Sequence, residues 1–258
     1  MLKREIQYLL AALQFFTRIP VPLSTPHDSV SLAHALKYFP LIGWLIGGLC
    51  ALAFSLASAM WPVSVAVVIS VAFGVLLTGA LHEDGFADSC DGFGGGWSRD
   101  QVLKIMKDPR IGNYAAIGLV LMLLLKVLTL IELAAMSPEL AMATLLLAHG
   151  ISRWLVLPLP WLLEYVRETD DSKAGTMVRA PFSGGMFAYA SLFVLLPLFY
   201  FGVPMIYQAT LCAALVVLVL ALYYRKRIGG YSGDCLGATQ QVAEVTIYLA
   251  VLASWNSV

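Results

Sequence analysis

The sequence has little charge. Only 12% of its 258 residues are Asp, Glu, Lys or Arg, whereas soluble globular proteins average about 25%. It has no excess of either sign, because 16 basic residues balance 16 acidic ones. The low charge and the 60% hydrophobic content exclude an ordinary soluble domain, and the charge balance gives no sign of a nucleic-acid partner. We therefore expect an integral membrane protein.

Cysteine is scarce and scattered. Cys50 and Cys212 lie in apolar runs, Cys90 and Cys235 lie in polar stretches, and no two of them form a CxxC pair. This spacing favours neither a disulfide framework nor a zinc site. The four side chains are expected to be free thiols.

The chain also lacks a convincing signal peptide. The first residues are basic, but the apolar part after them is short, is interrupted by Gln7, Gln14 and Arg18, and lacks a small-residue cleavage site. We expect instead an amphipathic or re-entrant helix at the membrane interface that runs to Phe16.

Long apolar runs are what the chain does have. A helix needs about 20 residues to span the hydrocarbon core. Runs near this length occur at about 39–60, 62–81, 111–135, 140–163, 184–205, 207–224 and 239–256. No repeat or second domain is visible. The sequence thus predicts one all-α membrane domain over residues 1–258, a polytopic bundle of about seven transmembrane helices plus the N-terminal helix.

Basic residues fall on alternate connections between these spans. Fourteen of the 16 lie before the first span or in three of the connections: Lys3, Arg4, Arg18, Lys37; Arg99, Lys104, Lys107, Arg110; Arg167, Lys173, Arg179; Arg225, Lys226, Arg227. The positive-inside rule then places the N-terminus, the stretch 82–110 and the other large loops in the cytoplasm, and the C-terminus outside.

The stretch 82–112, HEDGFADSCDGFGGGWSRDQVLKIMKDPRIG, is where chemistry is expected. It holds six of the 16 acidic residues between two apolar runs. Read as a helix continuing the preceding run, it places Asp84, Asp88 and Asp91 within about 60° on one face. It also places them near a helix C-terminus, because Gly92 and other glycines follow.

Three carboxylates on one helical face repel one another unless a cation shares their oxygens. Mg²⁺ suits such a site, because it takes carboxylate ligands and completes its shell with water and substrate phosphates. A solvated acidic loop is the alternative interpretation. Lys104, Lys107 and Arg110 follow on a short helix that Ser98 is expected to cap, and they would offset phosphate charge or face anionic lipid.

Two basic residues fall inside spans, where charge is costly. Arg153 is expected to contact an anionic substrate, with a structural pair to Glu132 or Glu244 as the alternative. Lys126 is expected to be structural. His149 is interpreted as a satisfied interior histidine.

Two further polar stretches are predicted on the same side of the membrane. Residues 169–185 have the composition of a loop that could cover a site. Residues 225–244 contain several glycines around Asp234 and would allow close backbone approach to a ligand. Ordinary cytoplasmic connections are the alternative for both.

The 82–112 stretch closely resembles the signature of the cobalamin synthase family, the adenosylcobinamide-GDP ribazoletransferases. Further matching segments are FFTRIPVP at 15–22, KYFPLIGWLIGG at 37–48, SRW at 152–154 and GGYSGDCLGA at 229–238 with Glu244 after it. The resemblance covers most of the chain.

The resemblance implies a multi-pass enzyme of the prokaryotic inner (plasma) membrane. It would join adenosylcobinamide-GDP to α-ribazole or its 5′-phosphate and release GMP, with Mg²⁺ required. A second copy of the chain or other corrinoid-pathway enzymes are further candidate partners.

The matching residues supply the candidate site. Asp84, Asp88 and Asp91, with Glu83, would hold Mg²⁺, and Asp88 is favoured as the group that takes the proton of the attacking hydroxyl. The candidates for substrate binding are Lys104, Lys107, Asp108, Arg110, Arg153, Gly233, Asp234 and Glu244.

Two alternatives remain at this point. DSCDG is similar to the opening of the CDP-alcohol phosphotransferase motif, although the rest of that pattern is missing. An ion-coupled transporter would use Lys126, Glu132, Arg153 and Glu244 as its pathway. Transporters tend to show inverted repeats and sites near the bilayer midplane, neither of which the acidic stretch suggests.

Overall fold

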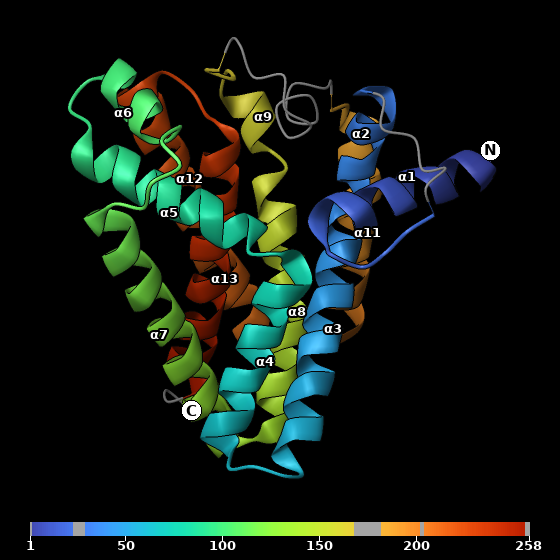
Figure 1. Cartoon of the computed structure of the whole chain (residues 1–258). Helices are drawn as coiled ribbons and strands as arrows, with labels where there is room; N and C mark the ends of the chain where they lie inside the picture. The colour runs from blue at the N-terminus through green and yellow to red at the C-terminus, as the bar shows by residue number, and fades with distance from the viewer. Residues whose placement is uncertain (1, 23–28, 168–181, 202–203, 256–258) are drawn as a thin grey trace.

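The computed structural model describes residues 2–22, 29–167, 182–201 and 204–255, and this part of the chain is helical (Figure 1). Its only bridge of β type joins the single residues Tyr165 and Tyr231. The elements are α1 Leu2–Phe16, α2 Ser29–Ala35, η1 Leu36–Tyr38, α3 Phe39–Ser58, α4 Val63–Thr78, α5 Leu81–Gly95, α6 Arg99–Ile105, α7 Asn113–Met136, α8 Pro138–Val156, α9 Leu159–Leu162, α11 Gly184–Phe201, α12 Pro204–Ile228 and α13 Gly233–Trp255. The predicted all-α fold is confirmed.

Each of the seven predicted spans forms a helix. Five stretches are long and apolar enough to cross a membrane, and they contain α3, α7, α8, α12 and α13. The bent pair of α4 and α5 raises the number to six if it counts as one span, and α11 supplies a shorter apolar helix. The loop predicted at 169–185 lies largely outside the described residues. The protein is a polytopic membrane helix bundle.

Helix α13 lies in the middle of the bundle and packs against α12, α5, α8 and α7. Helices α3 and α8 approach each other most closely through glycines. A side chain at Gly43 or Gly47 would overlap the backbone of α8, at His149 and Leu145. Small residues at such interfaces let the backbones of membrane helices approach closely. Dispersion forces from this close packing drive the association, because lipid is as apolar as the helix surface and gives no hydrophobic driving force.

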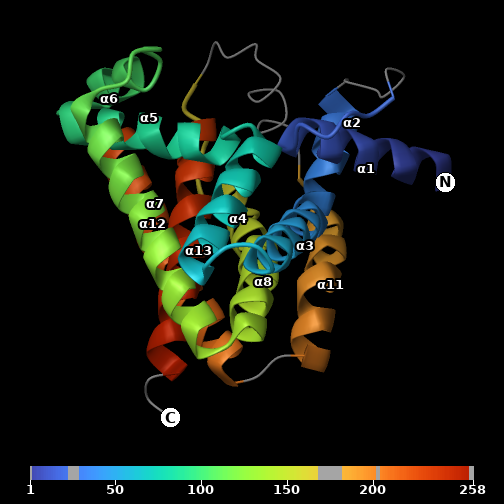
Figure 2. The ribbon, with the colours of Figure 1, turned by 60° about the horizontal axis from the view of Figure 1, so that its bottom comes forward.

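The chain turns sharply between α4 and α5. Gly79 and Ala80 both adopt left-handed backbone angles, with φ of 66° and 59°, and the two helix axes meet at 89°. The expectation that the acidic stretch continues the preceding helix was therefore wrong. Figures 1 and 2 show α5 lying across one end of the bundle, next to α6.

The N-terminal helix ends at Phe16, as predicted, and lies across the same end of the bundle (Figure 1). Glu5 fixes it there, because its carboxylate accepts a hydrogen bond from Tyr38 Oη at 2.6 Å and pairs with Lys37 Nζ at 2.6 Å. Lys37 also lies about 5 Å from the ring centres of Tyr8 and Tyr189. These contacts join α1 to η1 and α11.

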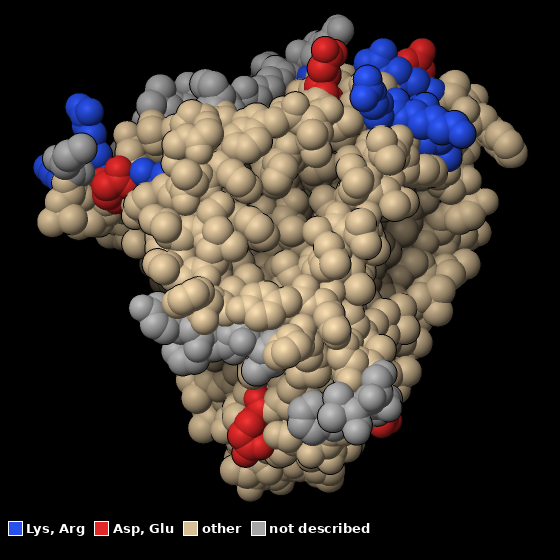
Figure 3. Space-filling view, turned by 180° about the vertical axis from the view of Figure 1, so that it is seen from behind, with Lys and Arg blue, Asp and Glu red and all other residues tan. Residues whose placement is uncertain are grey.

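Charged side chains are scarce on the middle of the molecular surface. In the face shown in Figure 3, Lys and Arg gather at the upper end, and the central band has no Lys, Arg, Asp or Glu among its described residues. Large apolar side chains are exposed along α4, α7, α11 and α12, including Leu76, Leu121, Leu195 and Val219. This distribution suits a lipid-facing belt with its basic rim on the side of α5 and α6.

Candidate active site: a carboxylate cleft at the end of the bundle

The acidic helix α5 is held against the bundle by small residues. A side chain at Gly85 would meet the backbone of Asp234 on α13, and one at Gly92 would meet Met106 just after α6. Glu83 and Asp84 lie in the first turn of α5, where the helix dipole favours negative charge. The helix continues to Gly95, so the expectation that all three aspartates crowd its C-terminus was wrong.

The three aspartates line one cleft, so the predicted shared face is confirmed. The cleft has a volume of about 210 Å³ and lies between α5 and the start of α7. Its lining residues are Ala80, Glu83, Asp84, Ala87, Asp88, Asp91, Asp108, Pro109, Arg110, Ile111, Ala115 and Leu119. Carboxylates thus form one wall, and apolar side chains of α7 form part of the other.

Asp91 has backbone partners. Its Oδ2 accepts a hydrogen bond from the N–H of Gly112 at 2.6 Å, and its Oδ1 accepts one from the N–H of Ala115 at 2.9 Å. The first N–H groups of a helix have no partner within the helix, and Asp91 accepts from two of them at the start of α7. Asp91 therefore holds α7 against α5 and offsets the positive end of the α7 dipole, which fixes one edge of the cleft.

Asp84 and Asp88 differ from Asp91. Within the part of the chain that the structure describes, neither side chain takes part in a hydrogen bond or an ion pair. Burial, followed by the charges of Asp234 and Asp84, raises the pKa of Asp88 to about 7. The carboxylate form of Asp88 is thus disfavoured until a cation approaches it.

The acidic wall offers oxygen atoms of the kind that Mg²⁺ binds. Among the described residues, no three His, Cys, Asp or Glu side chains converge closely enough to hold a metal ion by themselves. Mg²⁺ often uses only one or two protein carboxylates and completes its shell with water and phosphate oxygens. Asp84 and Asp88 supply such oxygens, and one oxygen of Glu83 is buried without a partner in the described residues.

The predicted cations divide into two groups. Arg110 lies on the rim of the cleft, where it pairs with Asp108 at 2.6 Å and lowers the pKa of that carboxyl to about 2. Lys104 and Lys107 are exposed on and after α6 and do not line the cleft. Ser98 caps α6 in a reciprocal capping box with Gln101, which confirms the predicted helix start.

Asp234 lies near the acidic wall without lining the cleft. It sits in the first turn of α13, behind Gly85, and is hydrogen-bonded to Arg167 and Ser232. After burial, its charge is the largest cause of the raised pKa of Asp88. Gly233 begins α13 and has open space where a side chain would lie.

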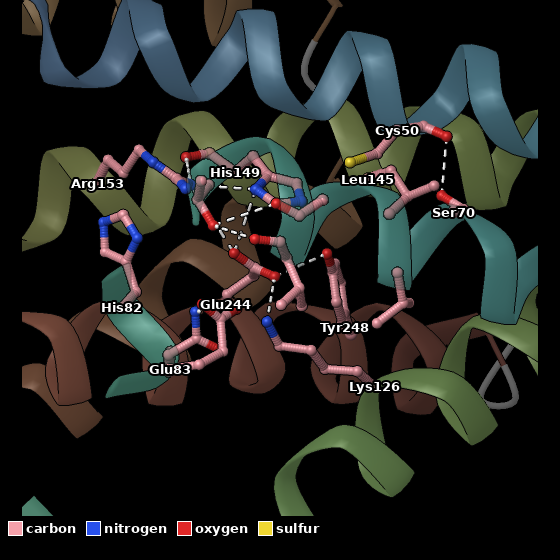
Figure 4. Close-up of a pocket in the computed structure, with 15 residues that line it drawn as sticks. Cys50, Ser70, His82, Glu83, Lys126, Leu145, His149, Arg153, Glu244 and Tyr248 are labelled. Atoms are coloured by element: carbon pink, nitrogen blue, oxygen red, sulfur yellow. Dashed lines mark hydrogen bonds and ion pairs between the residues drawn. The ribbon is translucent and has the colours of Figure 1, made fainter. Parts of the chain in front are cut away.

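The charged residues of the spans form a separate cluster in the bundle interior (Figure 4). Glu244 Oε1 accepts a hydrogen bond from Lys126 Nζ at 2.8 Å. Its Oε2 lies 3.3 Å from His149 Nδ1 and 3.8 Å from Arg153 Nη1. Arg153 is only 1% exposed, so the structure shows the structural pair with Glu244, and Glu132 stands apart in an exposed position.

Glu83 connects the two regions. It lines both the cleft and a small buried cavity whose wall includes Lys126, His149, Arg153 and Glu244. Sequence reasoning missed the residues on this boundary, above all Gln240 and Gln241, which are 0% and 2% exposed. The signal was present, because two adjacent amides inside an apolar span are costly unless they are hydrogen-bonded.

All four cysteines are free, as predicted, and they lie on four different helices, α3, α5, α12 and α13.

Comparison with known proteins places these residues in a family context. A protein from Shewanella frigidimarina named adenosylcobinamide-GDP ribazoletransferase is 43% identical over 97% of this chain and 95% of its own length. A protein of the same name from Leptospira interrogans is 37% identical over 100% and 99% of the two chains. No solved structure matches. The family model of cobalamin-5-phosphate synthase matches residues 8–252, and the chain therefore belongs to the cobalamin-5-phosphate synthase family.

Proposed function

We propose that the protein is an adenosylcobinamide-GDP ribazoletransferase. It joins adenosylcobinamide-GDP to α-ribazole or its 5′-phosphate, and it releases GMP together with adenosylcobalamin or its 5′-phosphate. The relatives of this name align with nearly the whole chain. The observation that carries the proposal at the level of the site is the cleft that gathers Asp84, Asp88 and Asp91 on one wall.

The reaction is a phosphoryl transfer from a pyrophosphate. The oxygen of a ribose hydroxyl forms a bond to the phosphorus that is linked to cobinamide, the bond from that phosphorus to the bridging oxygen breaks, and GMP leaves with the bridging oxygen. Asp88 lines the cleft between Asp84 and Asp91, and we favour it as the carboxylate that accepts the hydroxyl proton.

The carboxylates would hold the Mg²⁺ ion that this family's reaction requires. Asp84 and Asp88 would supply the main ligands, with Glu83 at the inner wall and Asp91 held in place by the N-terminus of α7. The ion would supply positive charge that offsets the charge on the phosphate oxygens. Arg110 on the rim is paired with Asp108, and it would offset charge on the leaving phosphate by exchanging that partner for the substrate.

The cleft faces the cytoplasm of a prokaryotic cell in this proposal. It lies at the end of the bundle where Lys and Arg gather in Figure 3, and positive residues favour the cytoplasmic side of the inner membrane. A nucleotide-linked substrate reaches it there from solution.

The transporter alternative is disfavoured by the interior cluster. Lys126 and Arg153 share the carboxylate of Glu244, and the cavity beside them is about 20 Å³, which is room for roughly one water molecule. These charges are paired with one another inside the bundle, whereas an ion pathway needs groups that exchange with both sides.

The test is GMP release by the purified protein in lipid, given adenosylcobinamide-GDP, α-ribazole and Mg²⁺, with Asp88→Asn alongside. The wild type should produce GMP and a complete corrinoid, and the variant should turn over at least about a hundredfold more slowly while it stays folded. CMP release from a CDP-alcohol in place of GMP release from adenosylcobinamide-GDP, or no turnover by folded wild type, contradicts the proposal. An Asp88→Asn variant as fast as wild type moves the metal site elsewhere.

A further inference from the structure

Two buried glutamines link the interior cluster to the wall of the cleft. Gln240 Nε2 donates a hydrogen bond to Glu244 Oε2 at 2.7 Å, and Gln240 Oε1 accepts one from Gln241 Nε2 at 2.9 Å. Gln241 Nε2 also donates to Glu83 Oε1 at 3.1 Å. The chain of hydrogen bonds therefore runs from α13 in the bundle core to the first turn of α5.

The order of donors and acceptors in this chain is fixed. Each amide has two N–H groups, and both are used: Gln240 donates to Glu244 and to Ser152 Oγ at 3.1 Å, while Gln241 donates to Gln240 and to Glu83. Reversing the Gln241 amide would point its oxygen at the Glu83 carboxylate, which repels it. Since Glu244 can only accept, it sets the direction of the whole chain.

Glu244 is itself held from several sides. Lys126 Nζ at 2.8 Å and Tyr248 Oη at 3.1 Å both donate to its Oε1, and His149 and Arg153 lie beside its Oε2. In Figure 4 these side chains converge on Glu244 from α7, α8 and α13. The end of the chain opposite Glu83 is therefore rigid.

Glu83 is the end that matters for the cleft. Its Oε1 is taken by Gln241, and its Oε2 is buried without a hydrogen-bond partner in the described residues. The residue lines both the interior cavity and the carboxylate cleft. A single amide donor thus decides how the innermost carboxylate of the cleft is oriented.

We propose that Gln241 is a positioning residue that aims the Glu83 carboxylate at the cation in the cleft, and that the Glu244 cluster supports it through Gln240. The proposal rests on the cation-dependent function proposed above. It gives the interior charges a role in the reaction although they lie away from the cleft.

The test is a titration of the full-length protein in lipid nanodiscs with Mn²⁺, followed through the electron paramagnetic resonance signal of the free ion. Gln241→Met keeps the size of the side chain and removes both donors, and it should weaken Mn²⁺ binding about tenfold. Glu83→Gln should weaken it by a similar factor. The Mn²⁺ affinity of the double variant should be no lower than that of the single variant with the lower affinity, because the two substitutions remove the same interaction.

Ser70→Ala is the matched control. It removes a buried hydrogen bond to the backbone oxygen of Cys50 beside the same interior cavity but outside the chain that ends at Glu83, and it should leave the Mn²⁺ affinity unchanged. If Gln241→Met does not fold, Gln240→Met breaks the same chain one link earlier and should give the same weakening.

Wild-type affinity in a folded Gln241→Met protein overturns the proposal, and so does a loss that adds fully to that of Glu83→Gln. Either result leaves the function itself standing, provided that Asp88→Asn abolishes Mn²⁺ binding. A wild-type protein that binds no Mn²⁺ contradicts the metal site of the proposed function and the role of Gln241 with it.

Discussion

The carboxylate cleft and the interior cluster hold charge in opposite ways. In the cluster, Glu244 faces Lys126 and Arg153, and each charge is buried against a partner. In the cleft, Asp84 and Asp88 are open to one side and have no protein cation of their own among the described residues, because Arg110 is paired with Asp108. The charges of the cluster are therefore paired within the protein. The carboxylates of the cleft are not, and they require a cation from outside, which is what a site for metal and phosphate needs.

Removing the anion of the interior cluster should have the largest effect. Glu244→Gln leaves Lys126 and Arg153 buried without a counter-charge, which typically costs about 3–5 kcal/mol. We expect a large drop in the thermal midpoint of the detergent-solubilised protein, or no folded protein at all. A midpoint within a few degrees of wild type would show that Glu244 is not the counter-charge that Lys126 and Arg153 require.

Substitution of Asp91 is expected to lower the stability of the protein, unlike substitution of the neighbouring Asp84. Both of its oxygens accept backbone N–H groups at the start of α7, so Asp91→Asn turns one acceptor into a donor that faces another donor. The expected loss of stability is about 2 kcal/mol. Thermal unfolding of the metal-free protein measures it, with Asp84→Asn as the control that should unfold like wild type.

The smallest expected effect is a gain in stability, on substitution of Asp88. The pKa of Asp88 is raised to about 7 in the folded protein, above the usual 3.8, so the folded state loses stability as pH rises from about 4 to about 7. Asp88→Asn removes this loss. After allowance for solvent screening we expect about 1 kcal/mol of added stability at pH 8 and less at pH 5.

The measurement is the thermal midpoint of wild type and Asp88→Asn without metal at the two pH values. Added Mg²⁺ should then narrow the difference at pH 8, because it binds the wild-type carboxylate and stabilises only that protein. A variant that is less stable than wild type at pH 8 would place Asp88 with Asp91 as a structural carboxylate.

Much of the fold was predictable because apolar runs of about 20 residues have few other solutions in a membrane. The cluster of aspartates was predictable for a similar reason, since Asp84, Asp88 and Asp91 follow helical spacing. The family assignment came from longer motifs of the same stretch. Each of these signals lies within a short segment, so it can be recognised without knowing which helices pack against that segment.

Other features depended on contacts between distant segments. The 89° turn at Gly79 and Ala80 placed α5 across the end of the bundle. The roles of Asp91 and Arg153 depended on which groups faced them, namely the start of α7 and Glu244. Helical spacing gives the direction of a side chain but not the identity of its partner.

The sequence by itself determined that this is an all-helical membrane protein with its chemistry in residues 82–112, because hydropathy and helical period are properties of short segments. Only the tertiary structure decided which charges have a partner within the protein and which do not. That distinction depends on packing, since the cost of a charge is set by what surrounds it: Glu244 is surrounded by cations, whereas Asp88 faces an open cleft.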